Sequence, residues 1–124
     1  MKTLKEYSIK EITNKVYDFI TRANIEIRGK LDGKDIAGQA KWFAQDLQNR
    51  NNFKNLYLHN IQDAFYEGVR DEQEDRYIIM NIPTYFRWVR KHKKRLDQAY
   101  YEVHTLNKIP AEVQYYQEPK KLLK

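Results

Sequence analysis

The sequence contains no cysteine and only four glycines, three prolines and three histidines. The lack of cysteine excludes disulfides, thiolate metal sites and cysteine nucleophiles, and it is compatible with a reducing intracellular compartment. So few glycines and histidines provide neither a Gly-rich phosphate loop nor a Ser/His/Asp arrangement. We therefore expect a protein without catalytic residues and without a cofactor.

Long apolar runs are also missing, and the charged start of the chain has no apolar stretch of the kind found in signal peptides. These absences predict a cytoplasmic protein with no membrane partner. His92 and His104 are 12 residues apart, which on one helix is roughly 18 Å and too far to share a metal ion. The acidic residues 71–75 lack the glycine and the spacing of a calcium loop. No metal site is predicted.

What the chain does contain is enough apolar surface for one core, because 41% of its 124 residues are hydrophobic and 14% are aromatic. Apolar residues recur at helical spacing over four segments. The sequence predicts an all-α fold, a compact bundle of four main helices with a long C-terminal helix and a short basic tail, forming a single helical domain over 1–124. The expected helices are 9–28, a second after Asp35 that ends near 48–52, 58–70, and 82 to about 106.

Local signals refine these helices. Ser8 and Glu11 fit a capping box, and Gly29 is expected to supply a left-handed end to the first helix. Asn81 is the expected cap of the last helix, with Pro83 in its first turn. Two short segments stay ambiguous, since 56–58 could be a strand and 77–80 either a strand or a buried linker. Residues 110–124 are expected to be a loosely packed tail with one short helix, 111–117, and a basic end.

The two tryptophans, Trp42 and Trp88, are interpreted as core anchors. An alternative for Trp88 is a contact with a ligand, since it lies beside Arg95 on the flank of the helix.

The last helix carries an apolar seam on one side, spaced at alternating steps of four and three residues: Tyr85, Val89, His92, Leu96, Ala99, Val103 and Leu106. Such a seam packs into a core or forms a homo-oligomer. His92 on this seam is interpreted as a packed neutral histidine.

All of the net charge of +6 lies in the C-terminal part of the chain, because residues 1–76 hold 13 basic and 13 acidic residues and residues 77–124 hold 10 and 4. No acid occurs between Asp75 and Asp97. Cations spaced one turn apart along a helix can follow the phosphates of a strand, and a tyrosine in line with them can stack on a base. The predicted nucleic-acid-binding residues, with DNA favoured over RNA, are Arg87, Arg90, Lys91, Lys94, Arg95 and Tyr101.

Two other interpretations account for the same charge. A cationic helix face is commonly a solvated surface that keeps a small protein soluble. It can also dock on an acidic protein, since electrostatics alone does not separate the two polyanions. The competing functional class is therefore a protein-interaction or assembly component, such as a helical virion protein, in which the seam and the ten tyrosines make subunit contacts.

The segment 58–70, with its Ala-Phe-x-x-Gly ending, and the aromatic pair and tryptophan of 81–89 resemble small helical proteins of bacteriophages and mobile elements that assist DNA replication, of the helicase-loader or DnaD-like type. The resemblance covers residues 56–95 and carries over no functional residue. It implies an adaptor that contacts DNA and a replicative helicase or initiator.

Overall fold

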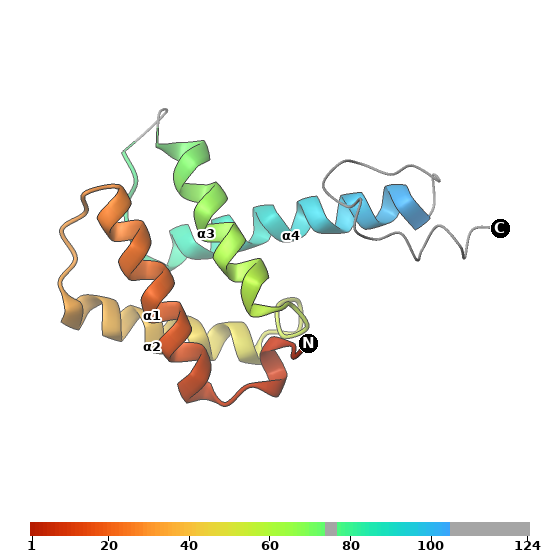
Figure 1. Ribbon diagram of the computed structural model, residues 1–124, viewed down its shortest axis with the longest axis horizontal. Coiled ribbons are helices and arrows are strands. Elements are labelled where there is room, and N and C mark those ends of the chain that lie inside the picture. Colours follow the sequence, from red (N-terminus) through yellow and green to blue (C-terminus); the bar gives the residue numbers. More distant parts are fainter. Residues whose placement is uncertain (74–76, 105–124) are drawn as a thin grey trace. The chain divides into compact units, whose positions relative to one another are not determined.

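The computed structural model describes residues 1–73 and 77–104, and its long elements are all helices (Figure 1). In chain order they are a short 3-10 helix η1 (Leu4–Glu6), α1 (Ile9–Glu26), α2 (Gly33–Asn49), α3 (Leu58–Glu72) and α4 (Ile82–His104). The described residues contain no strand, only one antiparallel bridge between Thr3 and Tyr57. The all-α class with four main helices is confirmed.

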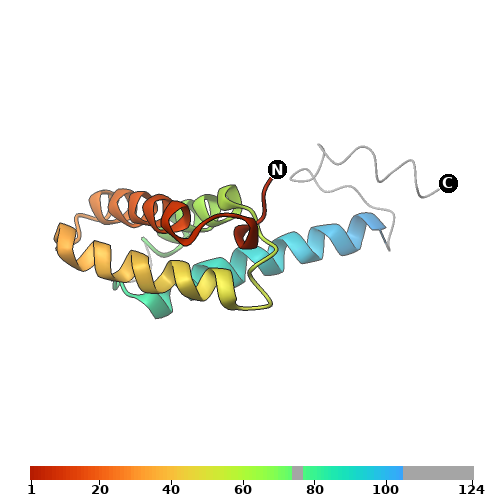
Figure 2. The same cartoon turned by 90° about the horizontal axis from the view of Figure 1, so that it is seen from below.

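The chain divides into two units, Met1–Val89 and Arg90–Lys124. Helix α4 contributes its first residues, to Val89, to the first unit and the rest to the second. In the first unit α1 packs against α2 and α3, and Figure 2 shows α1 and α2 running side by side. The predicted helix 111–117 and the basic tail lie outside the described residues.

The start of α1 is the predicted capping box. The Glu11 amide donates to Ser8 Oγ at 3.2 Å, and the Ser8 amide donates to Glu11 Oε1 at 3.1 Å. The bond from the Ser8 amide, and after it the Ser8 hydroxyl acting on the carboxylate, lower the pKa of the exposed Glu11 carboxyl from its ordinary value. The box therefore satisfies backbone donors that the first turn of a helix leaves unpaired.

The end of α1 differs from the prediction, because Arg28 and not Gly29 has the left-handed conformation, with φ of 56°. The Gly29 amide donates to the Asn24 carbonyl at 2.8 Å and the Arg28 amide to that of Ile25 at 3.1 Å, which is the Schellman pattern with Arg28 at its left-handed position. A Cβ at Gly29 would lie 2.1 Å from Asn24 Oδ1, so a larger residue there would require the Asn24 side chain to shift.

Helix α2 begins earlier than predicted. Its N-cap is Asp32, whose carboxylate accepts the amide of Asp35 at 2.8 Å, so the residue expected to be the cap lies inside the first turn. Aspartate is a favoured N-cap residue, so Asp32 and Asp35 are both candidates for the cap of α2. The helix includes Gly33 and Lys34, and Asp32 is therefore the N-cap. The predicted end within 48–52 is confirmed.

An aromatic cluster joins the helices of the first unit. The Phe43 ring from α2 lies 6.0 Å from that of Phe65 on α3 and 5.6 Å from that of Tyr85 on α4, and Trp88 contacts Phe65 edge to face at 5.3 Å. Trp88 is 1% exposed, which confirms it as a core anchor. Trp42 is 66% exposed, so that prediction was wrong. Trp42 lies off the buried stripe of α2, which comprises Ile36, Ala40, Phe43, Ala44 and Leu47.

The segment 77–80 is an extended linker in which burial alternates: Ile78 and Met80 are buried, while Tyr77 and Ile79 are exposed. Gln39 of α2 fixes it, because its Nε2 donates to the Met80 carbonyl at 3.0 Å and its Oε1 accepts the hydroxyl of buried Tyr85. Of the two predicted alternatives, the buried linker is the one that forms.

The start of α4 is as predicted, since Asn81 Oδ1 accepts the amide of Thr84 at 3.0 Å. The seam is largely covered within one chain. Tyr85 and Val89 are buried in the first unit, and in the second unit Ala99 and Val103 form a small buried cluster. Leu106 lies outside the described residues.

Candidate nucleic-acid interface

All six predicted nucleic-acid-binding residues are exposed on α4: Arg87, Arg90, Lys91, Lys94, Arg95 and Tyr101. They do not form one set, because Arg87 belongs to the first unit and the other five to the second.

Arg87 holds α4 to α3. Its Nε and Nη2 donate to the two carboxylate oxygens of Glu72, at 2.9 and 2.6 Å. The hydrogen bond and the charge of Glu72 raise the pKa of the Arg87 guanidinium, although burial acts in the opposite sense. This bidentate pair gives Arg87 a structural role, and a phosphate would have to compete with Glu72 for it.

In the second unit, the four cations Arg90, Lys91, Lys94 and Arg95 are exposed over less than two turns of helix. The neighbouring Lys93 is paired with Asp97 one turn later, at 2.7 Å between Nζ and Oδ2. Residues 90–104 hold five cations and two acids, a net charge of +3 with histidine neutral. A net charge of +3 on this part of α4 attracts polyanions.

Aromatic side chains follow these cations. Tyr101 is 49% exposed and lies eleven residues, about three turns, after Arg90, so both side chains project in similar directions. Tyr100 is 58% exposed, and its ring centroid lies 3.9 Å from that of His104. Sequence reasoning missed Tyr100; its spacing of four residues from His104 is the signal that could have identified the pair.

Other chemistry finds no support among the described residues. His92 is buried, in agreement with its interpretation as a packed residue. Within 1–73 and 77–104, no group of three or more histidines and carboxylates could hold a metal ion. Trp88 is buried and so cannot be the ligand contact that was the alternative for it. None of the described helices has both the length and the apolar character needed to cross a membrane.

Comparison of the chain with family models, curated proteins and solved structures gives no match.

Proposed function

We propose that this chain is a nucleic-acid-binding protein, not an enzyme, and that it binds through the exposed cations and tyrosines of α4 in its second unit. The observation that carries the proposal is a helix surface with four exposed cations, Arg90, Lys91, Lys94 and Arg95, in a region with no acid before Asp97.

Binding through phosphates implies a sequence-independent contact. DNA is favoured over RNA as the ligand because of the replication context proposed below. The exposed rings of Tyr100 and Tyr101 add base stacking where the strand is single. In keeping with the resemblance of residues 56–95, the proposed context is DNA replication of a phage or mobile element, with a replicative helicase or initiator as a protein partner.

The test compares two quadruple variants of equal charge. In the first, Arg90, Lys91, Lys94 and Arg95 become Gln. In the control, four exposed cations of the first unit become Gln: Lys5, Lys10, Lys15 and Lys34. Each variant lowers the net charge from +6 by four, so any difference reports on position and not on total charge.

We expect the α4 variant to lose most of its affinity for single- and double-stranded DNA in gel-shift or anisotropy titrations, and the control to keep most of it. Arg87 stays unchanged in both variants because its pair with Glu72 supports the fold. Equal losses in the two variants would indicate a diffuse charge effect. Undiminished binding by the α4 variant would refute the proposal.

The second candidate is a protein-interaction component. It is favoured by a separate observation, the large apolar side chains that the first unit leaves exposed, among them Trp42, Tyr77 and Ile25.

A further inference from the structure

A cleft between α1 and α3 lies outside the proposed nucleic-acid site. Its volume is about 260 Å³, and its lining includes Phe19, Ala23, Phe65 and Tyr66. Ala23 and Phe65 are buried, so the deepest part of the cleft is apolar. Small-molecule pockets usually measure about 300–1,000 Å³, and a cleft below that range suits a single large side chain.

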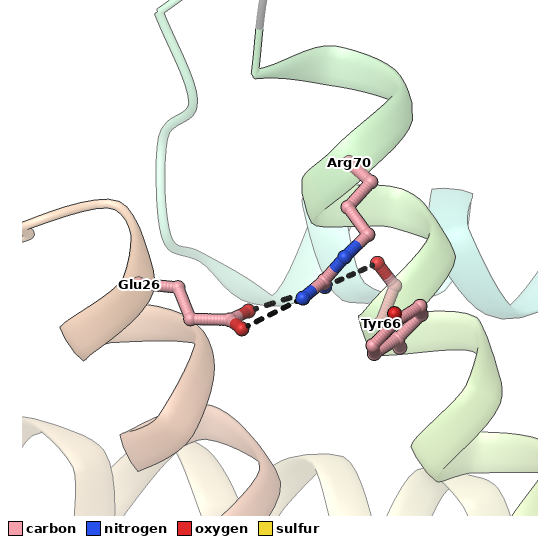
Figure 3. Close-up of polar contacts among 3 residues, drawn as sticks. All are labelled: Glu26, Tyr66 and Arg70. Atoms are coloured by element: carbon pink, nitrogen blue, oxygen red, sulfur yellow. Dashed lines mark hydrogen bonds and ion pairs between the residues drawn. The ribbon is translucent and has the colours of Figure 1, made fainter.

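One end of the cleft is fixed by a bridge from α1 to α3 (Figure 3). Arg70 Nη2 lies 3.1 Å from Glu26 Oε1, Arg70 Nη1 donates to the Tyr66 carbonyl at 3.2 Å, and the guanidinium stacks 3.4 Å from the Tyr66 ring centroid. Glu26 and Tyr66 both line the cleft. The bridge therefore joins the two helices beside the cleft.

The mouth of the cleft carries opposite charges on its two sides, Arg22 on α1 and Asp63 on α3. Both side chains are exposed. Neither makes a hydrogen bond or ion pair in the part of the chain that the structure describes. A matching ligand would thus combine one large apolar group with a cation on one side and an anion on the other.

Helix α2 presents that combination on its outer surface. Trp42 projects to solvent, and Asp46 lies one turn later on the same side of the helix. Lys41 immediately precedes Trp42, about 100° round the helix, so a charge of each sign lies near the indole. Over the described ranges, the Lys41 and Asp46 side chains also lack a hydrogen bond or ion pair. At Gly38, one turn before Trp42, a Cβ would meet no atom within 4 Å, so the surface beside the indole is open to close approach.

We infer that the first unit self-associates by inserting Trp42 of one copy into the α1–α3 cleft of a second copy, with Lys41 facing Asp63 and Asp46 facing Arg22. Because the inserted surface and the receiving cleft are different, the contact is heterologous. Association then continues beyond a dimer unless a ring closes. This inference does not depend on nucleic-acid binding.

Charge inversion tests the pairing without altering net charge. The cleft-inverted variant carries Arg22→Glu and Asp63→Lys, and the Trp42-side variant carries Lys41→Glu and Asp46→Lys. Each alone sets like charges against each other and should remain monomeric. Mixed in equal amounts, each variant's Trp42 surface matches the other's cleft, so association should return. Trp42→Ala is the apolar control and should weaken association at least about thirtyfold, the effect of an interface hot spot.

Sedimentation of the full chain from about 10 µM to about 1 mM measures these masses, with circular dichroism to confirm that each variant is folded. A wild-type chain that stays monomeric throughout this range would overturn the inference. So would variants that associate like wild type, or a mixture that fails to restore association.

Tryptophan fluorescence gives a second readout that needs no charge variant. The difference between the wild-type and Trp42→Phe spectra isolates Trp42, and its emission should move to shorter wavelength as concentration rises. An emission maximum that does not change with concentration would contradict the insertion of Trp42.

Discussion

Alanine at Gly68 and alanine at Gly38 should change the stability of the protein in opposite directions. Both glycines lie inside helices, Gly68 in α3 and Gly38 in α2, and neither has a positive φ. In a helix interior alanine is more favourable than glycine by about 1 kcal/mol, and this gain applies to both. The difference between them comes from what the added methyl group meets.

A Cβ at Gly68 would lie 2.2 Å from Trp88 Cγ and 2.4 Å from Cδ1 and Cδ2, whereas a Cβ at Gly38 meets nothing within 4 Å. The Trp88 ring cannot move away easily, because it is buried and packed 5.3 Å from Phe65 and 5.9 Å from Tyr85, measured between centroids. Overpacking of a core costs about 1–3 kcal/mol of stability. We place the cost of the Gly68 methyl group near the upper end of this range, because it would contact the Cγ end of the rigid Trp88 ring.

We therefore expect Gly68→Ala to lower the free energy of unfolding by about 2 kcal/mol net, and Gly38→Ala to raise it by about 1 kcal/mol. Urea denaturation followed by far-UV circular dichroism measures both. Near-UV dichroism of Gly68→Ala should also change, since Trp88 must shift. The cost of Gly68→Ala should shrink in a Trp88→Phe background, where the smaller ring leaves room. A Gly68→Ala protein as stable as wild type would refute the packing of Trp88 on α3.

Three further changes test local features of the first unit. Glu11→Ala should lower the melting temperature at pH 7. The Glu11 pKa lies below its ordinary 4.5 in the folded state, so the stability that Glu11 contributes is fully present above pH 4.5 and is lost as pH falls through the lowered pKa. The difference in melting temperature between the variant and wild type should therefore disappear in acid. A difference that persists at pH 2 would contradict the capping role. Arg87→Gln should cost about 1 kcal/mol in urea denaturation, because Glu72 loses a bidentate partner at a half-exposed site, and no loss would indicate that the pair does not stabilise the fold. Arg28→Gly should raise the free energy of unfolding by about 0.5–1 kcal/mol, because glycine tolerates φ of 56°; a lower free energy of unfolding would show that the arginine side chain has a stabilising contact.

The helices of this protein follow from short-range signals that the sequence displays. Apolar spacing and capping residues predict the bounds of α1 and α3 and the start of α4 to within about two residues of those observed. They can do so because capping bonds and the contacts along one helix face join residues only three or four positions apart. Where two residues compete for one local role the sequence does not decide. Asp32 and Asp35 are both capable N-caps, and of the adjacent Arg28 and Gly29 it is Arg28 that takes the left-handed position.

Tertiary features were less accessible. Leu4, in a short 3-10 helix, is fully buried, and its amide donates to the Leu56 carbonyl at 2.8 Å, a pairing of distant segments with no periodic pattern. Trp42 is a large apolar residue on an exposed face. Its residue type wrongly predicted burial, whereas its position around the helix, off the buried stripe of α2, correctly indicates exposure. Exposure of the cationic residues on α4 was predictable from their position opposite the seam. The pairing of Arg87 with Glu72 was not, because it depends on how α3 and α4 pack.

The salt dependence of DNA binding tests the central claim most directly. For wild type and the control variant, log K should fall steeply with log salt concentration, because cations on α4 release counterions from phosphates. Replacing Arg90, Lys91, Lys94 and Arg95 by Gln should flatten that slope by up to about 3 on single strands and about 4 on duplex, if all four contact phosphate. Equal slopes for all three proteins, or no salt-sensitive binding of wild type below about 100 µM, would contradict the proposal.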